Sequence, residues 1–268
     1  MKTYFDAGAT MEFTTKGMLG SGHTITISKD GFHYQSLNGK VNVEMPFAEI
    51  GSMFLTNYCN QNFSYRVLLR DLNMKNMSVP ELELDTKPWN NGHNIREIKP
   101  LLIAFAASKL GAEFPNNLDS LNVALGATLA EKIIRISKGV IVGAKHQVPI
   151  ADIKRVKCVC TGALGALCVY TKLKGGFFDA PDMKLPINEI TMPLLEAIMT
   201  RNTGEGIDLS RGNGFDQKNS DYIAIRYMDS GFFLCADGSV RESWQQIAYN
   251  RVKSYDYDVN AHWSEKMG

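Results

Sequence analysis

The sequence lacks long hydrophobic runs. No stretch approaches the roughly 18 uninterrupted apolar residues that a membrane-spanning helix needs, so we expect no transmembrane segment. The opening, Met1 to Asp6, carries no apolar segment followed by a small-residue cleavage site. Position 2 is Lys and the chain closes on Glu-Lys-Met-Gly, so neither end shows an acylation motif. These absences predict a cytoplasmic protein.

An excess of charge of one sign is also missing. The formal net charge is +1, with 21% charged and 44% hydrophobic residues, which is typical of an ordinary globular chain. We therefore expect neither a disordered protein nor a general nucleic-acid binder. A length of 268 residues suffices for two domains that bury adequate cores without covalent cross-links.

Cysteine and histidine are few and irregularly spaced. The odd count of five cysteines favours reduced thiols in the core. A metal site that uses Cys158, Cys160 and Cys168 is the less favoured alternative, because no second ligand pair follows and no two histidines have ligand spacing. We expect no metal and no cofactor. The five cysteines are Cys59, Cys158, Cys160, Cys168 and Cys235.

Catalytic motifs are absent too. No Gly-x-Ser-x-Gly sequence occurs, and the glycine segment at residues 161–165 lacks the Lys-Ser/Thr ending of a phosphate-binding loop. That segment is interpreted as a turn between two strands. Glu81 and Glu83 share one face of an expected strand, which is the ordinary solvated face of a sheet. The sequence therefore predicts no catalytic residue, and an enzyme with a dispersed site is the alternative left open.

Two copies of one strand-rich pattern are present. Residues 25–34 and 45–55 form the first copy, and residues 134–142 and 148–159 form the second. Both contain Ile-Ser-Lys before a turn, and both contain apolar-Pro-apolar-Ala-acid-Ile before a new apolar segment. Alternation of period two predicts strands with one buried face. Pro46 and Pro149 cannot donate to a β-ladder, so an edge strand or the first position of a strand is expected for both.

Both copies continue into further short strands and then switch to helical spacing. Strands are expected at residues 65–70 and 82–84, and again at 167–170 and 183–185. Helices are expected at residues 94–110 and 188–199, and the first has an apolar stripe that should close an open end of its sheet. The stripe consists of Ile98, Leu101, Leu102 and Phe105. Asn94 and Asn188 are the expected N-caps, and Pro100 and Pro193 are expected in the first turns. Gly111 and Gly204 are expected to end the helices.

A third stretch repeats the opening meander alone. Residues 222–234 and 244–255 resemble the first strands of the other copies, and a glycine-rich polar linker at 204–220 precedes them. The predicted division is residues 1–117 for the first unit with an N-terminal extension, 118–210 for the second, and 211–268 for a partial third meander. Such a half-unit must pair with the rest of the chain or with another chain.

The order of strands, the apolar-Pro-apolar-x-acid-Ile motif and the closing helix resemble the pleckstrin-homology-like (PH-like) superfold, especially its bacterial and GRAM-type members. Residues 148–156 match best, and the resemblance covers about residues 22–114 and 129–203, with a partial copy at 221–259. It implies a mainly β protein with α-helix, in which each strongly bent antiparallel sheet is closed by a C-terminal helix. It also implies binding of lipid headgroups, peptides or proteins. The first hairpins lack the dense basic pattern of headgroup-binding members, so we do not carry over phosphoinositide binding; they hold Lys29 and Lys40, and Lys138, Lys145 and His146.

Two sets of residues are candidates for contact with partners. Lys154, Arg155 and Lys157 could meet an anionic ligand, in a region (residues 129–211) with 12 Lys+Arg against 8 Asp+Glu, or +4. Residues 212–268 hold 6 against 8, or −2. Their aromatic residues would mark a protein interface if they are exposed together, and are otherwise core residues. The leading hypothesis is a binding or assembly module that contacts a protein or its own copies, and the alternative is a peripheral binder of anionic membrane surfaces. The aromatic candidates are Trp244, Tyr249, Tyr255 and Trp263.

Overall fold

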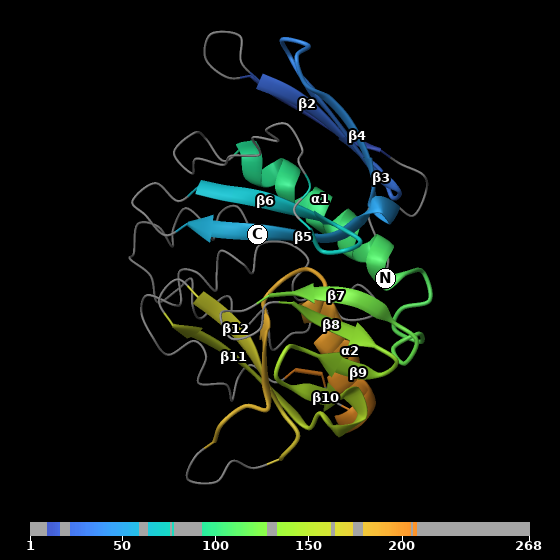
Figure 1. The fold of residues 1–268 in the computed structure, drawn as a ribbon, viewed down its shortest axis with the longest axis vertical. Coiled ribbons are helices and arrows are strands. Elements are labelled where there is room, and N and C mark those ends of the chain that lie inside the picture. The colour runs from blue at the N-terminus through green and yellow to red at the C-terminus, as the bar shows by residue number, and fades with distance from the viewer. Residues whose placement is uncertain are drawn as a thin grey trace, which may run out of the picture. The chain divides into compact units, whose positions relative to one another are not determined.

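The computed structural model describes residues 10–16, 22–58, 64–75, 77, 93–127, 133–161, 164–173, 179–204 and 206–207. The described chain consists of antiparallel sheets and two α-helices, which confirms the α+β class (Figure 1). Its described residues divide into two compact units: those up to residue 126 with 133–138, and residue 127 with those from 139 to 207. The predicted strand at 82–84 and the third meander at 211–268 lie outside the described residues.

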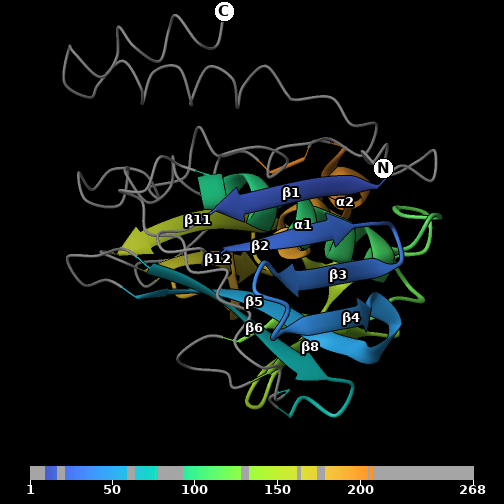
Figure 2. The same cartoon turned by 90° about the horizontal axis from the view of Figure 1, so that it is seen from above.

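The first sheet is a four-stranded meander. It consists of β1 (Met11–Lys16), β2 (Gly22–Ile27), β3 (Gly31–Ser36) and β4 (Asn42–Pro46), which pair in chain order (Figure 2). The predicted alternation is confirmed, because Ile25, Ile27, Phe32 and Tyr34 are all buried while their neighbours reach solvent. Strand β1 precedes the region that the sequence pattern marked as the first copy.

A short 3-10 helix, η2 (Phe47–Glu49), connects β4 to a second sheet. That sheet pairs β5 (Ile50–Tyr58) with β6 (Ser64–Asp71). Pro46 ends the edge strand β4, so the predicted edge position is confirmed and the first-residue alternative is wrong.

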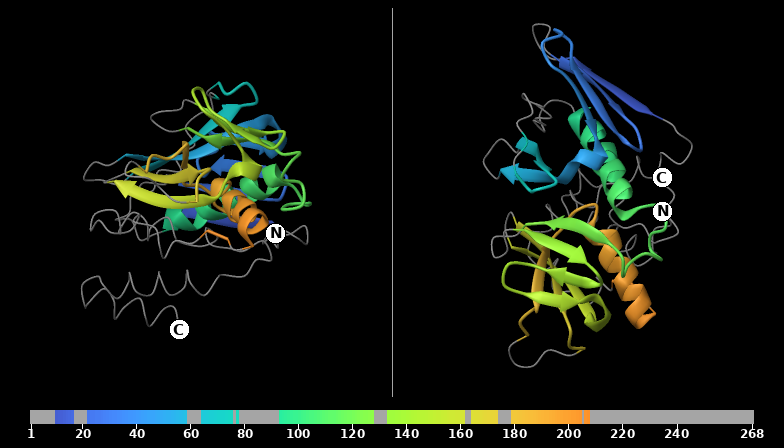
Figure 3. Two further views of the ribbon diagram at one scale, coloured as in Figure 1. Left: turned by 90° about the horizontal axis from the view of Figure 1, so that it is seen from below. Right: turned by 45° about the vertical axis from the view of Figure 1, so that its right-hand side comes forward.

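Helix α1 (His93–Leu110) lies against β1, β2 and β3 (Figure 3). Leu101, Leu102 and Phe105 are buried, and the Phe105 ring meets the Phe47 ring edge-on, with centroids 5.7 Å apart. The described part of the stripe is therefore buried, with α1 packed against the first sheet, while closure of an open end of that sheet stays a prediction. Burial of such side chains contributes about 1.5–3 kcal/mol each, enough together to hold a helix through an unfavourable residue.

Pro100 is that unfavourable residue, and the expectation for it was wrong. The helix begins at His93, so Pro100 is an interior residue and not part of the first turn, and Asn94 is the second helical residue and not the N-cap. An interior proline costs about 3 kcal/mol. The buried segment from Leu101 to Ala106 directly after it outweighs that cost. The side chains of residues 93–99, including Ile98, are outside the description.

The second set of sheets has the same order of elements. Strands β7 (Asn122–Gly126), β8 (Ile134–Ser137), β9 (Val140–Val142) and β10 (Gln147–Pro149) form a four-stranded sheet in chain order. The 3-10 helix η3 (Ile150–Asp152) leads to a sheet of β11 (Arg155–Thr161), β12 (Leu164–Tyr170) and β13 (Met183–Pro186), and the chain continues into α2 (Thr191–Thr203). Pro149 ends the edge strand β10, as Pro46 ends β4.

Helix α2 begins three residues later than expected, but its termini follow the predicted chemistry. Asn188 Oδ1 accepts hydrogen bonds from the backbone N–H groups of Ile190 and Thr191 at 3.0 and 2.9 Å. Pro193 lies in the first turn, where no N–H partner is lost. The N-cap residue is Ile190, so the prediction of Asn188 for that position was wrong, although its side chain accepts N–H groups at the start of the helix. At the other end Gly204 has φ +77° and closes the helix with a bond to Thr200 O, so the predicted stop is confirmed.

One contact recurs at the same place in both sets. Lys109, the penultimate residue of α1, donates from Nζ to the carbonyl of Phe47 at 2.8 Å. Asn202, the penultimate residue of α2, donates to the carbonyl of Ile150 at 2.7 Å, and also to that of Ile153 at 2.8 Å. Phe47 and Ile150 each follow the motif proline and are buried. Each helix is thus fastened by its last turn to the 3-10 helix that the repeated motif forms.

Candidate functional site

The strand pair β11 and β12 places the predicted basic residues. Arg155 stands opposite Tyr170, and Lys157 stands opposite Cys168. Residues two apart on a strand share a face, so Arg155 and Lys157 project from the same side of the sheet. At the end of the pair, Thr161 of β11 stands opposite Leu164, the first residue of β12, and residues 162 and 163 of the predicted turn lie outside the described residues.

Both cations converge on one carboxylate. The Arg155 Nη1 donates to Asp179 Oδ2 at 2.8 Å and its Nη2 donates to Oδ1 at 2.5 Å, which is a bidentate pair. Lys157 Nζ donates to the same Oδ2 at 2.8 Å. The three side chains are 21–26% exposed, so water reaches this cluster. We call Arg155, Lys157 and Tyr170 the carboxylate site.

The aromatic ring of Tyr170 makes cation–π contacts with Arg155 and Lys157. The Arg155 Cζ lies 4.0 Å from the Tyr170 ring centroid, and Lys157 Nζ lies 5.5 Å from it. Tyr170 and Cys168 are buried, at 5% and 2% exposure. The attraction between the guanidinium and the face of the buried ring restricts the positions that Arg155 can take.

The ion cluster fixes the charge states of its members. Hydrogen bonds from Arg155 and then Lys157 hold the pKa of the Asp179 carboxyl well below its usual range. The hydrogen bond with Asp179 raises the pKa of Arg155 above its ordinary value. Burial raises the pKa of the Tyr170 hydroxyl and that of the Cys168 thiol, the latter against the opposing charges of Lys184 and Lys157. The Arg155 guanidinium and the Asp179 carboxylate are therefore both ionised at neutral pH.

Lys154 does not join the cluster. Its Nζ donates to the carbonyl of Ala151 at 3.4 Å, and its backbone N–H donates to Tyr170 O at 2.9 Å. The structure therefore brings together two of the three predicted anion contacts. Cys168 is a free, buried thiol as predicted. The candidate interface residues Trp244, Tyr249, Tyr255 and Trp263 lie outside the described residues.

Sequence reasoning missed Asp179 and Tyr170. Tyr170 could have been found, because a hairpin turn centred near residues 162–163 pairs position 155 with position 170. Asp179 could not, because it lies between β12 and β13 and its distance from Arg155 depends on the path of that connection. No spacing rule relates it to the basic pair.

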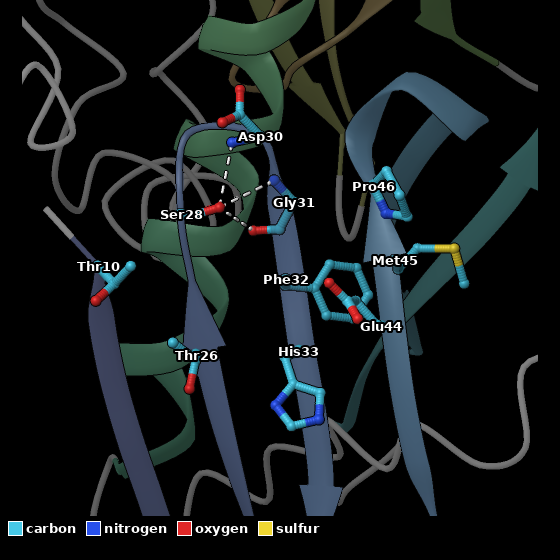
Figure 4. A pocket seen from close by; sticks show the side chains of 10 residues that line it. All are labelled: Thr10, Thr26, Ser28, Asp30, Gly31, Phe32, His33, Glu44, Met45 and Pro46. Atoms are coloured by element: carbon cyan, nitrogen blue, oxygen red, sulfur yellow. Dashed lines mark hydrogen bonds between the residues drawn. The ribbon is translucent and has the colours of Figure 1, made fainter. Parts of the chain in front are cut away.

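The first sheet carries a second, more open feature, shown in Figure 4. Thr26, His33 and Glu44 stand side by side on β2, β3 and β4, on the face opposite α1, and line a hollow of about 330 Å3 together with Ser28 and Asp30. The Oγ of Ser28 accepts hydrogen bonds from the N–H groups of Asp30 and Gly31 at 3.2 Å. These groups satisfy a turn, so the hollow is an ordinary polar face of an exposed sheet.

Metal-binding and membrane-spanning features were sought in the same residues. Within the described ranges no three His, Cys, Asp or Glu side chains come together as metal ligands. No helix in the described part of the chain combines the length and apolarity needed to cross a membrane. Comparison with known proteins yields neither a matching family model nor a similar curated protein.

Proposed function

We propose that the chain is a tandem PH-like protein that binds another protein or its own copies through its sheets. Each described set contains a four-stranded meander, a 3-10 helix after a proline, a second sheet and a helix. The recurrent contact between the helix end and the 3-10 helix supports an origin of both sets from one repeated unit.

The observation that carries the proposal is the edge strand β1. It pairs with β2 over all six of its residues, and among the described strands it is the end of its sheet. β4 and β10, at the opposite ends of the two meanders, both finish on proline, which hinders further pairing. β1 contains no proline, so its sequence does not oppose the addition of a strand from a partner as those of β4 and β10 do. The partial third meander at 211–268 is the contact element that the sequence predicts.

Analytical ultracentrifugation of the full chain over a concentration series tests this. Self-association should weaken in Thr14→Lys, because Thr14 is an exposed residue of β1 and lysine on an edge strand opposes pairing. Gln35→Lys is the matched control, since Gln35 is exposed on β3 in the same cross-strand row, away from the edge. If association occurs and both variants associate like the wild type, β1 is not the contact edge.

If the chain stays monomeric, self-association is excluded, and the proposal then requires that the chain binds a different protein. The full chain, immobilised, should then capture a partner from native lysate, and Thr14→Lys should lose that partner while Gln35→Lys keeps it. A monomer that captures nothing, or that keeps its partner in Thr14→Lys, contradicts the proposed function.

A second candidate function is contact with an anionic membrane surface. It is favoured by the position of Leu173, which is 72% exposed and follows the exposed Lys172 just beyond Tyr170. Reversal of charge at Lys154, Arg155 and Lys157 should abolish flotation with phosphatidylserine vesicles if this candidate holds. Flotation that needs neither anionic lipid nor these residues contradicts it.

A further inference from the structure

The carboxylate site is occupied by a carboxylate of the same chain. We propose that Arg155, Lys157 and Tyr170 recognise acidic side chains of a partner protein, and that Asp179 fills the site in cis and competes with that partner. This inference rests on the proposed function, since it assumes that the chain binds a protein, and it names the chemistry of one contact. The site is formed by residues of β11 and β12, whereas β1 belongs to the other compact unit.

The geometry of the site is that of carboxylate recognition. Three donors meet one carboxylate, with both Asp179 oxygens paired to the guanidinium and one also to Lys157. The Arg155 Cζ lies over the Tyr170 ring, 4.0 Å from its centroid. This cation–π contact involves no atom of Asp179, so it would still hold the guanidinium over the ring if another acidic side chain replaced Asp179.

The charges of the site are not balanced by Asp179. Among the residues that the structure describes, two cations pair with one anion, a surplus of one positive charge. The Nε of Arg155 is buried and has no hydrogen-bond partner among the described residues, so the guanidinium retains an unused donor. A segment with two neighbouring carboxylates would neutralise the cluster more completely than Asp179 does.

Displacement of Asp179 is feasible because the cluster is partly open. The side chains of Arg155, Lys157 and Asp179 are 22%, 21% and 26% exposed. Ion pairs in contact with water contribute little net stability, so an incoming acidic segment can exchange with the resident one.

The competing explanation is a structural tether that fastens the β12–β13 connection to β11. The two explanations predict opposite effects of removing Asp179 on the binding of an acidic peptide. A competitor that is removed leaves the site free and tightens binding, whereas a tether that is removed leaves the donors less ordered and weakens it.

The test uses the full chain and a fluorescein-labelled peptide of six glutamates, with affinity measured by fluorescence anisotropy at physiological salt. Asp179→Ala should tighten binding about tenfold, the gain expected when the resident carboxylate fills the site in roughly nine molecules of ten. Asp152→Asn, on the exposed η3, is the control because it changes net charge equally. In the Asp179→Ala background, Arg155→Ala and Lys157→Gln should each abolish the gain.

Asp179→Asn gives a second variant in case alanine disturbs folding, and thermal denaturation monitors both. If the Asp179 variants bind the peptide no more tightly than Asp152→Asn, the inference is overturned. Tightened binding of phosphatidylserine vesicles without tightened peptide binding would also overturn it, in favour of a membrane ligand. Because the assay does not depend on self-association or on β1, failure of the strand-edge proposal and failure of this one are distinguishable.

Discussion

At the scale of single residues, Asp179 links the pH dependence of stability to the ion cluster. Its folded-state pKa lies below its ordinary value because Arg155 and Lys157 hydrogen-bond to the ionised form. A depressed carboxyl pKa stabilises the fold above the unfolded-state pKa, near 4, and this contribution is lost as pH falls further toward the folded-state pKa. The ion pairs of Asp179 with Arg155 and Lys157 should therefore be intact across the neutral pH range.

We predict that Asp179→Asn lowers the urea midpoint of unfolding by a constant amount between about pH 5 and pH 8, and that its difference from the wild type shrinks below about pH 4. Urea titrations followed by circular dichroism at several pH values measure this. Asp152→Asn, an exposed carboxyl outside the cluster, should show a smaller effect throughout. If the difference in urea midpoint between the wild type and Asp179→Asn stayed unchanged down to about pH 3, the charge of Asp179 would not be the cause of that difference.

At the scale of elements, the end of α2 depends on Asn202. Its side chain satisfies the carbonyls of Ile150 and Ile153, both of them buried residues. We predict that Asn202→Ala lowers the free energy of unfolding by about 2 kcal/mol, because the substitution leaves buried acceptors without this donor. Chemical denaturation measures the loss. Asn116→Ala, the same change at an exposed position, should cost less than about 0.5 kcal/mol, and equal losses at both sites would refute the role of the contact.

Gly204, which ends the same helix, allows a prediction about backbone conformation. Gly204 has φ +77°, and a Cβ placed there would meet no atom within 4 Å. Any cost of substitution therefore comes from the left-handed backbone and not from a clash. Gly204→Ala should lower the free energy of unfolding by about 1 kcal/mol, while Gly204→Asn should lower it less, because asparagine tolerates this conformation. Denaturation curves that rank asparagine below alanine would contradict this explanation.

Strands and helices with a regular spacing of apolar residues could be predicted from the sequence. Elements whose position depends on tertiary packing could not. Ile25, Ile27, Ile134 and Ile136 alternate with polar residues, so their strands could be assigned from the sequence. Strand β7 has buried residues from Val123 to Gly126 with no alternation, so its pattern carries no strand signal. The start of α1 was predicted to within one residue, but Pro100 was wrongly placed in the first turn, since packing of the apolar segment after it overrides the local preference.

The candidate site was predictable only in part, for a related reason. Arg155 and Lys157 stood out as neighbouring charges on an alternating strand, and a hairpin register would have added Tyr170. The acceptor that they share, Asp179, lies between β12 and β13 and outside both strands, so no strand register relates it to Arg155 and Lys157. Charge composition alone suggested a free basic face, whereas the structure shows a basic pair that is bound to a carboxylate.

At the scale of the whole molecule, the two compact units each contain a helix fastened to its own 3-10 helix. Residues of each core, such as Phe47 with Phe105, are buried within their own set of elements. Loss of the contact between a helix and its 3-10 helix should therefore favour local opening of the compact unit that contains both, and leave the other unit closed.

Hydrogen-exchange mass spectrometry of the full chain tests this separation. Lys109→Ala should raise exchange in the segments at 22–58 and 93–110, because its Nζ no longer holds Phe47 O. Asn202→Ala should raise exchange in the segments at 140–170 and 183–203 instead. The cause in both variants is a lower free energy of local opening. If either variant raised exchange equally in all four segments, the two sets would unfold as one cooperative unit and the repeated contact would not act locally.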